Sequence, residues 1–263
     1  MGSDEQRPLS GLRARLAEPD GARLAAFVSI PRIEVVQIIG YCGYDIVILD
    51  GEHGVFDAAD LPGLVAIAHG VGLDVVVRVP ELRAQVIAAA LDAGADGVLV
   101  PHVRDADQAA QAVAACRFPP VGGRSVHGAV AAAHYGARPD YLRSADAQVA
   151  CIVMCEDADA LADIEAIATV PGVDAVFVGP YDLSASLGHV GEPEHPVVVE
   201  AVARVVAATG AHGLATGVMS ARPEASSDWF DAGCRFVVAG VDTAMLRQGV
   251  MATVTATGVR RSS

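Results

Sequence analysis

Ionisable residues stand at the ends of four short apolar runs in this sequence, whereas the runs themselves contain almost none. Carboxylates, a guanidinium and an imidazole are groups that bind cations, hold anionic substrates and transfer protons. Because the active groups of a parallel α/β barrel lie just past the carboxyl ends of its strands, we expect these side chains to gather at one face. The five residues are Asp50, His53, Arg78, Glu156 and Asp182.

Glu156 and Asp182 come from neighbouring predicted strands, so their carboxylates can converge on one point. Two hard oxygen ligands with the other positions open can hold Mg²⁺ or Mn²⁺ when the substrate completes the coordination shell. The alternative is a carboxylate pair without a cation, and burial would then force one of the two to stay neutral. The spacing predicts a divalent-cation site and leaves that alternative open.

Asp50 and His53 are three residues apart on a tight turn, close enough for a hydrogen bond between carboxylate and imidazole. Such a contact orients the ring and raises its basicity, as a general base requires, while the alternative is a purely structural histidine. Arg78 ends a buried strand and needs an anionic partner, either a substrate carboxylate or, as the alternative, Glu52 or another strand-end acid. The remaining histidines form no ligand-spaced motif, and two of them can reach the mouth of a barrel, His102 and His127.

The composition excludes several chemistries. None of the 263 residues is lysine, so all eighteen basic residues are arginine, and a Schiff-base aldolase, a pyridoxal enzyme or a P-loop NTPase is excluded. The formal charge of −14 disfavours nucleic acid and anionic membrane surfaces as partners. Five scattered cysteines, and no apolar run of about 18 residues, indicate a cytoplasmic protein in a reducing compartment.

Short apolar runs alternate with amphipathic stretches throughout the chain. The runs predict buried parallel strands at residues 25–30, 46–49, 75–79, 97–100, 149–154, 175–178, 214–218 and 236–239. The stretches between and after them predict helices at residues 33–40, 58–69, 82–93, 106–116, 158–168, 197–209, 224–232 and 243–257.

Eight such units in about 250 residues predict an α/β protein with a single-domain (β/α)8 TIM barrel. A doubly wound sheet is the rival architecture, but no GxGxxG follows the first strand. We expect an N-terminal extension with a lead-in helix at residues 1–22, the barrel at residues 23–258 and a disordered tail at residues 259–263. The irregular stretch from residue 118 to about residue 146 predicts a lid or a subunit contact.

Four segments in order resemble the HpcH/HpaI family of metal-dependent pyruvate aldolases. They read YDIVILDGEHGVF, VVVRVPE, GADGVLVPHV and VGPYDLSASLG, and the likeness extends from about residue 26 to about residue 246. The resemblance implies a divalent cation (Mg²⁺, Mn²⁺ or Co²⁺) on Glu156 and Asp182. It also implies that Arg78 binds pyruvate and that Asp50 and His53 form a catalytic dyad.

The resemblance further implies that backbone N–H groups of Gly179 and Tyr181 bind the pyruvate carboxylate. Members of this family are commonly hexamers whose last helix packs on a neighbour, so it implies a homo-oligomer (a hexamer or a trimer of dimers) with residues 243–257 exchanged. The implied reaction is reversible retro-aldol cleavage of a 4-hydroxy-2-oxo acid to pyruvate and an aldehyde. The implied partners are therefore small molecules, a 2-oxo acid and an aldehyde.

Two features depart from the family pattern. Met154-Cys155-Glu156 replaces the Gln-x-Glu of many relatives, and GGRSVHG replaces an RGxG-like loop. The identity of the aldehyde is therefore not predicted, and His127 is a candidate for shaping its pocket.

Two other functions stay open. One is a related metal-dependent lyase or synthase that uses oxaloacetate or a CoA ester, resembling the citrate lyase β subunit. The other is a non-catalytic barrel that binds a small acid.

Overall fold

The computed structural model describes residues 11–18 and 21–258, and its eight parallel strands close into a barrel in which each strand pairs with the next and β1 pairs with β8. The first ten residues of the expected extension and the expected tail at residues 259–263 lie outside the described residues. The (β/α)8 barrel is confirmed. Its strands are β1 (Arg23–Val28), β2 (Ile46–Asp50), β3 (Asp74–Arg78), β4 (Gly97–Val100), β5 (Ala150–Cys155), β6 (Ala175–Val178), β7 (Ala215–Met219) and β8 (Phe236–Val241).

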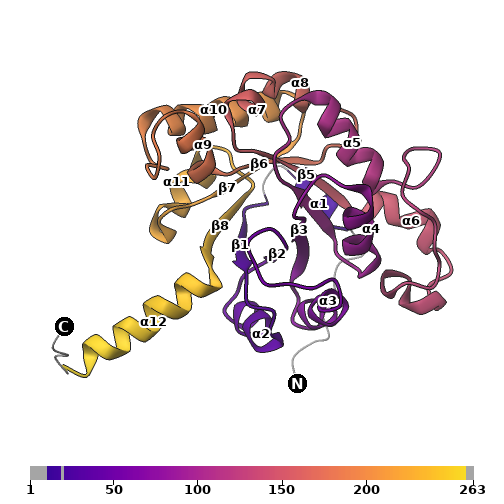
Figure 1. Ribbon diagram of the computed structural model, residues 1–263, viewed down its shortest axis with the longest axis horizontal. Coiled ribbons are helices and arrows are strands. Elements are labelled where there is room, and N and C mark those ends of the chain that lie inside the picture. The colour runs from indigo at the N-terminus through magenta and orange to yellow at the C-terminus, as the bar shows by residue number, and fades with distance from the viewer. Residues whose placement is uncertain (1–10, 19–20, 259–263) are drawn as a thin grey trace.

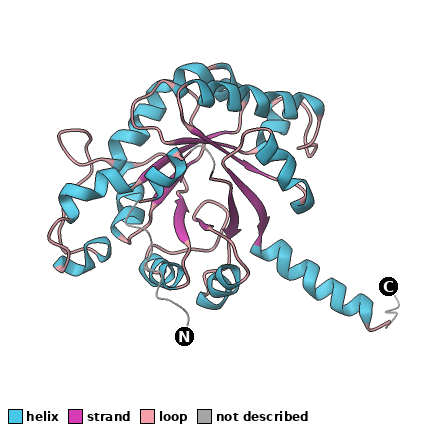
Figure 2. Cartoon of the chain, turned by 180° about the vertical axis from the view of Figure 1, so that it is seen from behind, coloured by secondary structure: helices cyan, strands magenta, loops and turns pink. Residues whose placement is uncertain are grey.

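Helices surround the barrel, as Figures 1 and 2 show from opposite sides. They are α1 (Leu12–Ala17), α2 (Ile33–Tyr41), α3 (Leu61–Gly70), α4 (Ala84–Asp92), α5 (Ala106–Cys116), the 3₁₀ helix η1 (Ala131–Gly136), α6 (Tyr141–Gln148), α7 (Ala158–Ala162), α8 (Ile164–Ala168), α9 (Pro180–Ser186), α10 (Pro196–Ala211), the 3₁₀ helix η2 (Pro223–Ala225), α11 (Ser226–Asp231) and α12 (Asp242–Ala256). One predicted helix, at residues 158–168, is divided into α7 and α8 at Asp163, and two helices, α6 and α9, were not predicted.

Aromatic side chains fill the barrel interior. Phe177 meets Phe27 edge to face at a centroid distance of 6.1 Å and stacks on Phe236 at 5.8 Å. Gly217 makes room for this stack, because a Cβ atom at that position would lie 2.1 Å from a ring atom of Phe236. The barrel interior is therefore filled by side chains up to the carboxyl-terminal ends of the strands.

The lead-in helix α1 covers the amino-terminal end of the barrel. Leu12 and Leu16 are fully buried and pack with the inward-facing residues of the strands. Arg15 on the same helix donates from Nε to the buried carboxylate of Asp74 at 3.0 Å, at the start of β3. This end of the barrel is closed by packing, which leaves the carboxyl-terminal end for a site.

The long stretch after α5 packs against the side of the barrel. Phe118, Ala133, Tyr141 and Ala145 form a small apolar cluster of their own, and the buried Arg124 lies over the Phe118 ring at 4.6 Å. Arg124 also donates to Asp92 of α4 (2.6 Å) and to the Tyr141 hydroxyl (2.8 Å). None of the described residues of this stretch lines the cavity at the carboxyl-terminal end of the barrel, and the lid or subunit contact expected for it stays a prediction.

Helix α12 leaves the barrel and extends away from it (Figure 1). Asp242 at its start is buried and accepts the backbone N–H groups of Ser29 and Ile30, so the base of the helix is fixed to the loop after β1. Within the described ranges, no helix is long and apolar enough to cross a membrane.

Candidate active site

A cavity of about 530 Å³ opens at the carboxyl-terminal end of the barrel. Each strand leads at this face into a βα loop, and these loops carry the polar side chains of the site. Six of the seven site residues expected from the sequence line the cavity. These are Asp50, His53, Arg78, Gly179, Tyr181 and Asp182.

Glu156, the seventh residue, lies beside this cavity. It directly follows β5 and is only 3% exposed. A Cβ atom on Gly179 would lie 3.2 Å from Glu156 Oε2, so this glycine leaves room for the carboxylate between β5 and the start of α9. The structure therefore brings all seven expected residues to one end of the barrel.

Asp50 and Arg78 form a buried bidentate ion pair. Arg78 donates from Nε to Oδ1 and from Nη2 to Oδ2 of Asp50, both at 2.8 Å, and the two residues are register partners on β2 and β3. Burial raises the pKa of Asp50, but the hydrogen bonds and charge of Arg78, together with the backbone N–H groups of His53 and Glu52, outweigh burial and lower it. Asp50 is therefore held as a carboxylate.

The expected hydrogen bond between the Asp50 carboxylate and the His53 ring is not made. Asp50 accepts the backbone N–H of His53 at 3.1 Å, and Arg78 engages both of its carboxylate oxygens. The His53 side chain is exposed, and in the described part of the chain its ring makes no hydrogen bond. Asp50 thus positions the turn that carries His53, and the imidazole is available to a substrate.

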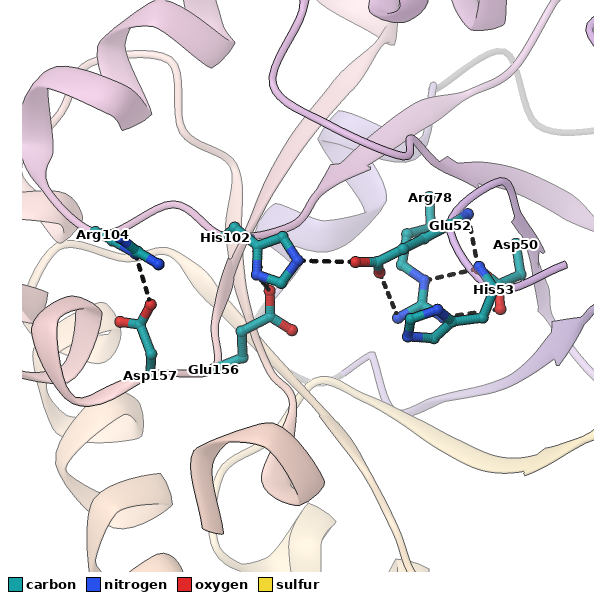
Figure 3. A network of polar contacts seen from close by, with 8 residues as sticks. All are labelled: Asp50, Glu52, His53, Arg78, His102, Arg104, Glu156 and Asp157. Atoms are coloured by element: carbon teal, nitrogen blue, oxygen red, sulfur yellow. Dashed lines mark hydrogen bonds and ion pairs between the residues drawn. The ribbon is translucent and has the colours of Figure 1, made fainter. Parts of the chain in front are cut away.

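Glu52 and His102 connect this ion pair to Glu156 (Figure 3). Glu52 Oε2 lies 3.0 Å from Arg78 Nη1, and Glu52 Oε1 lies 2.9 Å from His102 Nε2. On its other side, His102 Nδ1 lies 3.0 Å from Glu156 Oε1. The alternative expected for Arg78 was Glu52 or another strand-end acid, and the structure pairs it with two such acids, Glu52 and Asp50.

His102 was expected only to reach the mouth of the barrel, because it belongs to no ligand-spaced motif. Its signal was its place two residues after β4, inside the GADGVLVPHV segment. His127, the other histidine expected to reach the mouth, is exposed, lies outside the cavity lining and accepts the Ala129 N–H at its own Nδ1. Strand-end position was thus the better guide to the site.

The carboxylates at Glu156 and Asp182 fit a divalent cation. Burial raises the pKa of Glu156, and the charges of Glu52 and Asp182 raise it further against the lowering effect of His102. Asp182, in the first turn of α9, is exposed, and its carboxylate accepts no hydrogen bond from any described residue. An excess of negative charge with free oxygen donors is what Mg²⁺, Mn²⁺ or Co²⁺ would neutralise.

The backbone of the Gly179–Tyr181 turn differs in part from the expectation. The Gly179 N–H donates to the Cys155 carbonyl at 3.2 Å, so it is not free for a substrate carboxylate. The Tyr181 N–H, at the start of α9, has no backbone or side-chain partner among the described residues. The first turn of a helix presents such N–H groups to anions, so Tyr181 keeps the expected capacity while Gly179 provides space for Glu156.

Another histidine group, which was not expected from the sequence, lies in the loop after α9. Potential ligand atoms of His189, Glu192 and His195 lie within 4.8 Å of one another. The two imidazole rings stack at a centroid distance of 3.5 Å, and His195 Nδ1 accepts the Val197 N–H at the start of α10. These contacts connect the two ends of the loop and fix it to the start of α10.

Comparisons with known proteins agree with this geometry. The sequence profile of the family described as HpcH/HpaI aldolase/citrate lyase matches residues 23–249. The chain is 39% identical over 238 residues to a hydroxypyruvate/pyruvate aldolase of Paraburkholderia phytofirmans, covering 88% of this chain and 91% of that protein. It is 38% identical to a 4-hydroxy-2-oxovalerate aldolase of Rhodococcus jostii, covering 92% and 93%.

A solved structure agrees with the fold as well. It is that of an HpcH/HpaI aldolase/citrate lyase family protein from Burkholderia cenocepacia. Its TM-score to this chain is 0.90 at 37% sequence identity, and the match covers 94% of this chain and 99% of that one.

Proposed function

Because the chain belongs to the HpcH/HpaI aldolase/citrate lyase family, it is an enzyme that cleaves carbon–carbon bonds, and we propose that it is a metal-dependent pyruvate aldolase. Its substrate would be a 4-hydroxy-2-oxo acid, which it would cleave reversibly to pyruvate and an aldehyde. The observation that carries the proposal is the pair of oxygen donors at Glu156 and Asp182, close to Arg78 and to the unbonded His53 ring.

Glu156 and Asp182 would hold the cation, Mg²⁺, Mn²⁺ or Co²⁺. When bound, the cation supplies Lewis-acid stabilisation of the negative charge that develops on the 2-oxo group as the bond breaks. The chain supplies no lysine, so the charge cannot be carried by a Schiff base. The carboxylate oxygens of Glu156 and Asp182 can instead hold a cation that stabilises this charge.

Arg78 would orient the 2-oxo acid. Two of its five N–H groups donate to Asp50, and Glu52 Oε2 lies 3.0 Å from Nη1 as an ion pair. These contacts fix the guanidinium plane, and the remaining N–H groups can donate to a substrate oxygen. The Tyr181 N–H at the start of α9 would donate to the substrate carboxylate. Both groups are held by the scaffold before substrate arrives, which lowers the entropy cost of orienting it.

His53 would act as the general base. Its exposed ring lines the cavity and is unengaged by other described side chains, so it can accept the proton from the C4 hydroxyl during cleavage and return it in the aldol direction. Asp50 contributes by fixing the turn through the His53 backbone N–H.

Removal of the cation tests the proposal. Protein treated with EDTA and freed of chelator should lose pyruvate formation from a 4-hydroxy-2-oxo acid and regain it with Mn²⁺, Mg²⁺ or Co²⁺, but not with NaCl of equal ionic strength. Circular dichroism should show that the stripped protein keeps its fold. Full activity in stripped protein would refute a metal-dependent mechanism.

A further inference from the structure

His102 contacts one oxygen of Glu156 twice. Its backbone N–H donates to Glu156 Oε1 at 2.7 Å, and its Nδ1 lies 3.0 Å from the same atom (Figure 3). The far side of the ring is fixed as well, because Nε2 lies 2.9 Å from Glu52 Oε1. Glu52 is in turn held by Arg78 at 3.0 Å. The ring therefore lies between the carboxylates of Glu52 and Glu156 and contacts both.

The backbone of His102 is bent to allow this double contact. Its φ of 56° lies in the left-handed region, which is strained for most non-glycine residues and which they rarely adopt. Such a conformation persists only when the surrounding contacts fix it. Here it directs the backbone N–H of His102 to the same carboxylate oxygen that the ring approaches.

The other oxygen of Glu156 is left free. Oε2 accepts no hydrogen bond within the described part of the chain, and it faces Gly179, where a Cβ atom would lie 3.2 Å away. Asp182 is three residues beyond Gly179, in the first turn of α9. Oε2 is therefore turned to the side from which Asp182 approaches.

We propose that His102 is a positioning residue that occupies Oε1 of Glu156, so that Glu156 offers only Oε2 to a divalent cation. A carboxylate restricted to one oxygen suits the octahedral shell of Mg²⁺ or Mn²⁺. Ca²⁺ takes six to eight oxygens and often binds carboxylates through both. His102 thereby makes the site selective for small octahedral cations over Ca²⁺. This inference rests on the proposed cation site at Glu156 and Asp182.

Two substitutions separate the contacts of the ring. The side-chain amide nitrogen of asparagine can take the place of His102 Nδ1, and asparagine tolerates the left-handed backbone. The amide nitrogen of glutamine instead can take the place of Nε2. His102→Asn therefore keeps a nitrogen beside Glu156 Oε1 and removes the one beside Glu52 Oε1, whereas His102→Gln does the reverse.

The affinities of substrate-free protein for Mn²⁺ and Ca²⁺ provide the test, with Mn²⁺ followed by electron paramagnetic resonance and Ca²⁺ by calorimetry. His102→Gln should weaken Mn²⁺ binding about tenfold or more, the size typical of residues that orient a metal ligand, and should shift the Kd ratio toward Ca²⁺. His102→Asn should stay within about threefold of the wild type on the same scale. His127→Gln, at an exposed histidine outside the cavity, is the control.

Wild-type Mn²⁺ affinity in His102→Gln would overturn the positioning role while leaving the aldolase proposal intact. Absence of Mn²⁺ binding to the wild type, with full activity after EDTA treatment, would instead refute the proposed function. If His102→Gln does not fold, a Mn²⁺-soaked wild-type crystal decides the question. Coordination through one oxygen of Glu156 supports the inference, and coordination through both overturns it.

Discussion

The Asp50 carboxylate and the Arg78 guanidinium are both buried, and each is the main partner of the other. Removing the Asp50 charge takes both hydrogen bonds from the buried Arg78 and leaves Glu52 as its remaining carboxylate partner. Asp50→Asn should therefore lower the free energy of unfolding by about 3 kcal/mol in urea titrations at pH 7. The control is Glu165→Gln in the exposed ion pair with Arg204, which should leave it unchanged.

The same pair predicts a pH dependence. The pKa of Asp50 is lowered in the folded protein, so its stabilising effect is complete above the unfolded value of 3.8 and is lost as the pH falls through the folded value. The difference in unfolding free energy between wild type and Asp50→Asn should thus be constant near neutrality and shrink below about pH 4. An unchanged difference at pH 3 would show that Asp50 is not held as described.

His53 should matter for turnover rather than for stability. Because its ring is exposed and unbonded, His53→Ala should lower kcat by about 10²- to 10⁴-fold, with little change in KM or Tm. His212→Ala, an exposed histidine at the opposite end of the barrel, is the matched control and should be fully active. Unchanged kcat in His53→Ala would remove the general base from the mechanism.

At this scale, residue type and strand-end position predicted which side chains gather, but not how they pair. A separation of three residues placed Asp50 near His53. The adjacent strand, however, brought the Arg78 guanidinium to Asp50, and it donates two hydrogen bonds to the carboxylate, which an imidazole ring cannot do. The use of the Gly179 N–H by Cys155 likewise depends on a contact between strands. Which hydrogen-bond partner a site residue takes therefore depends on contacts between strands that are distant in the sequence.

The elements themselves were largely predictable from local sequence. All eight strands lie within two residues of their expected ends, because β-branched and apolar residues run almost without interruption in parallel strands buried on both faces. Helices α6 and α9 were missed because they are eight and seven residues long, and so show little periodicity. The break between α7 and α8 at Asp163 was hidden in a continuous alanine-rich pattern.

Helix α12 carries an apolar stripe that the barrel does not cover. Its exposed large apolar side chains recur at helical spacing, and they are Leu246, Val250, Met251 and Val254. We propose that a second copy of the chain covers this stripe in a homo-oligomer, a hexamer or a trimer of dimers. This occupant fits the exposed apolar side chains, because burying them against another subunit would remove them from water.

Charges placed on the stripe test the assembly. Leu246→Glu with Val250→Glu should reduce the mass measured by light scattering, since burying two carboxylates in an apolar contact is unfavourable. Gln248→Glu, two residues along on the opposite side of the helix, should leave the mass unchanged. A truncation after Met245 should act like the double variant, and it keeps Asp242, which holds the loop after β1. An unaltered mass in both would exclude α12 from the interface.

For the molecule as a whole, the stacked rings inside the barrel leave no room for an added carbon. Gly217→Ala should place a methyl group against Phe236 and lower the free energy of unfolding by about 1–3 kcal/mol, measured in urea. The control is Gly63→Ala, on an exposed position of α3 with nothing within 4 Å, which should be neutral or slightly stabilising. Equal stability of the two variants would contradict the packing described.

The pairing of β1 with β8 has a consequence for biosynthesis. As the ribosome releases the chain from its amino terminus, β1 emerges before the other seven strands and its final neighbour, β8, emerges after them. Until then both edges of the growing sheet expose unpaired backbone groups, which can recruit other nascent chains. A chaperone that shields these edges during translation would therefore raise the yield of active protein, more than one that acts only after release.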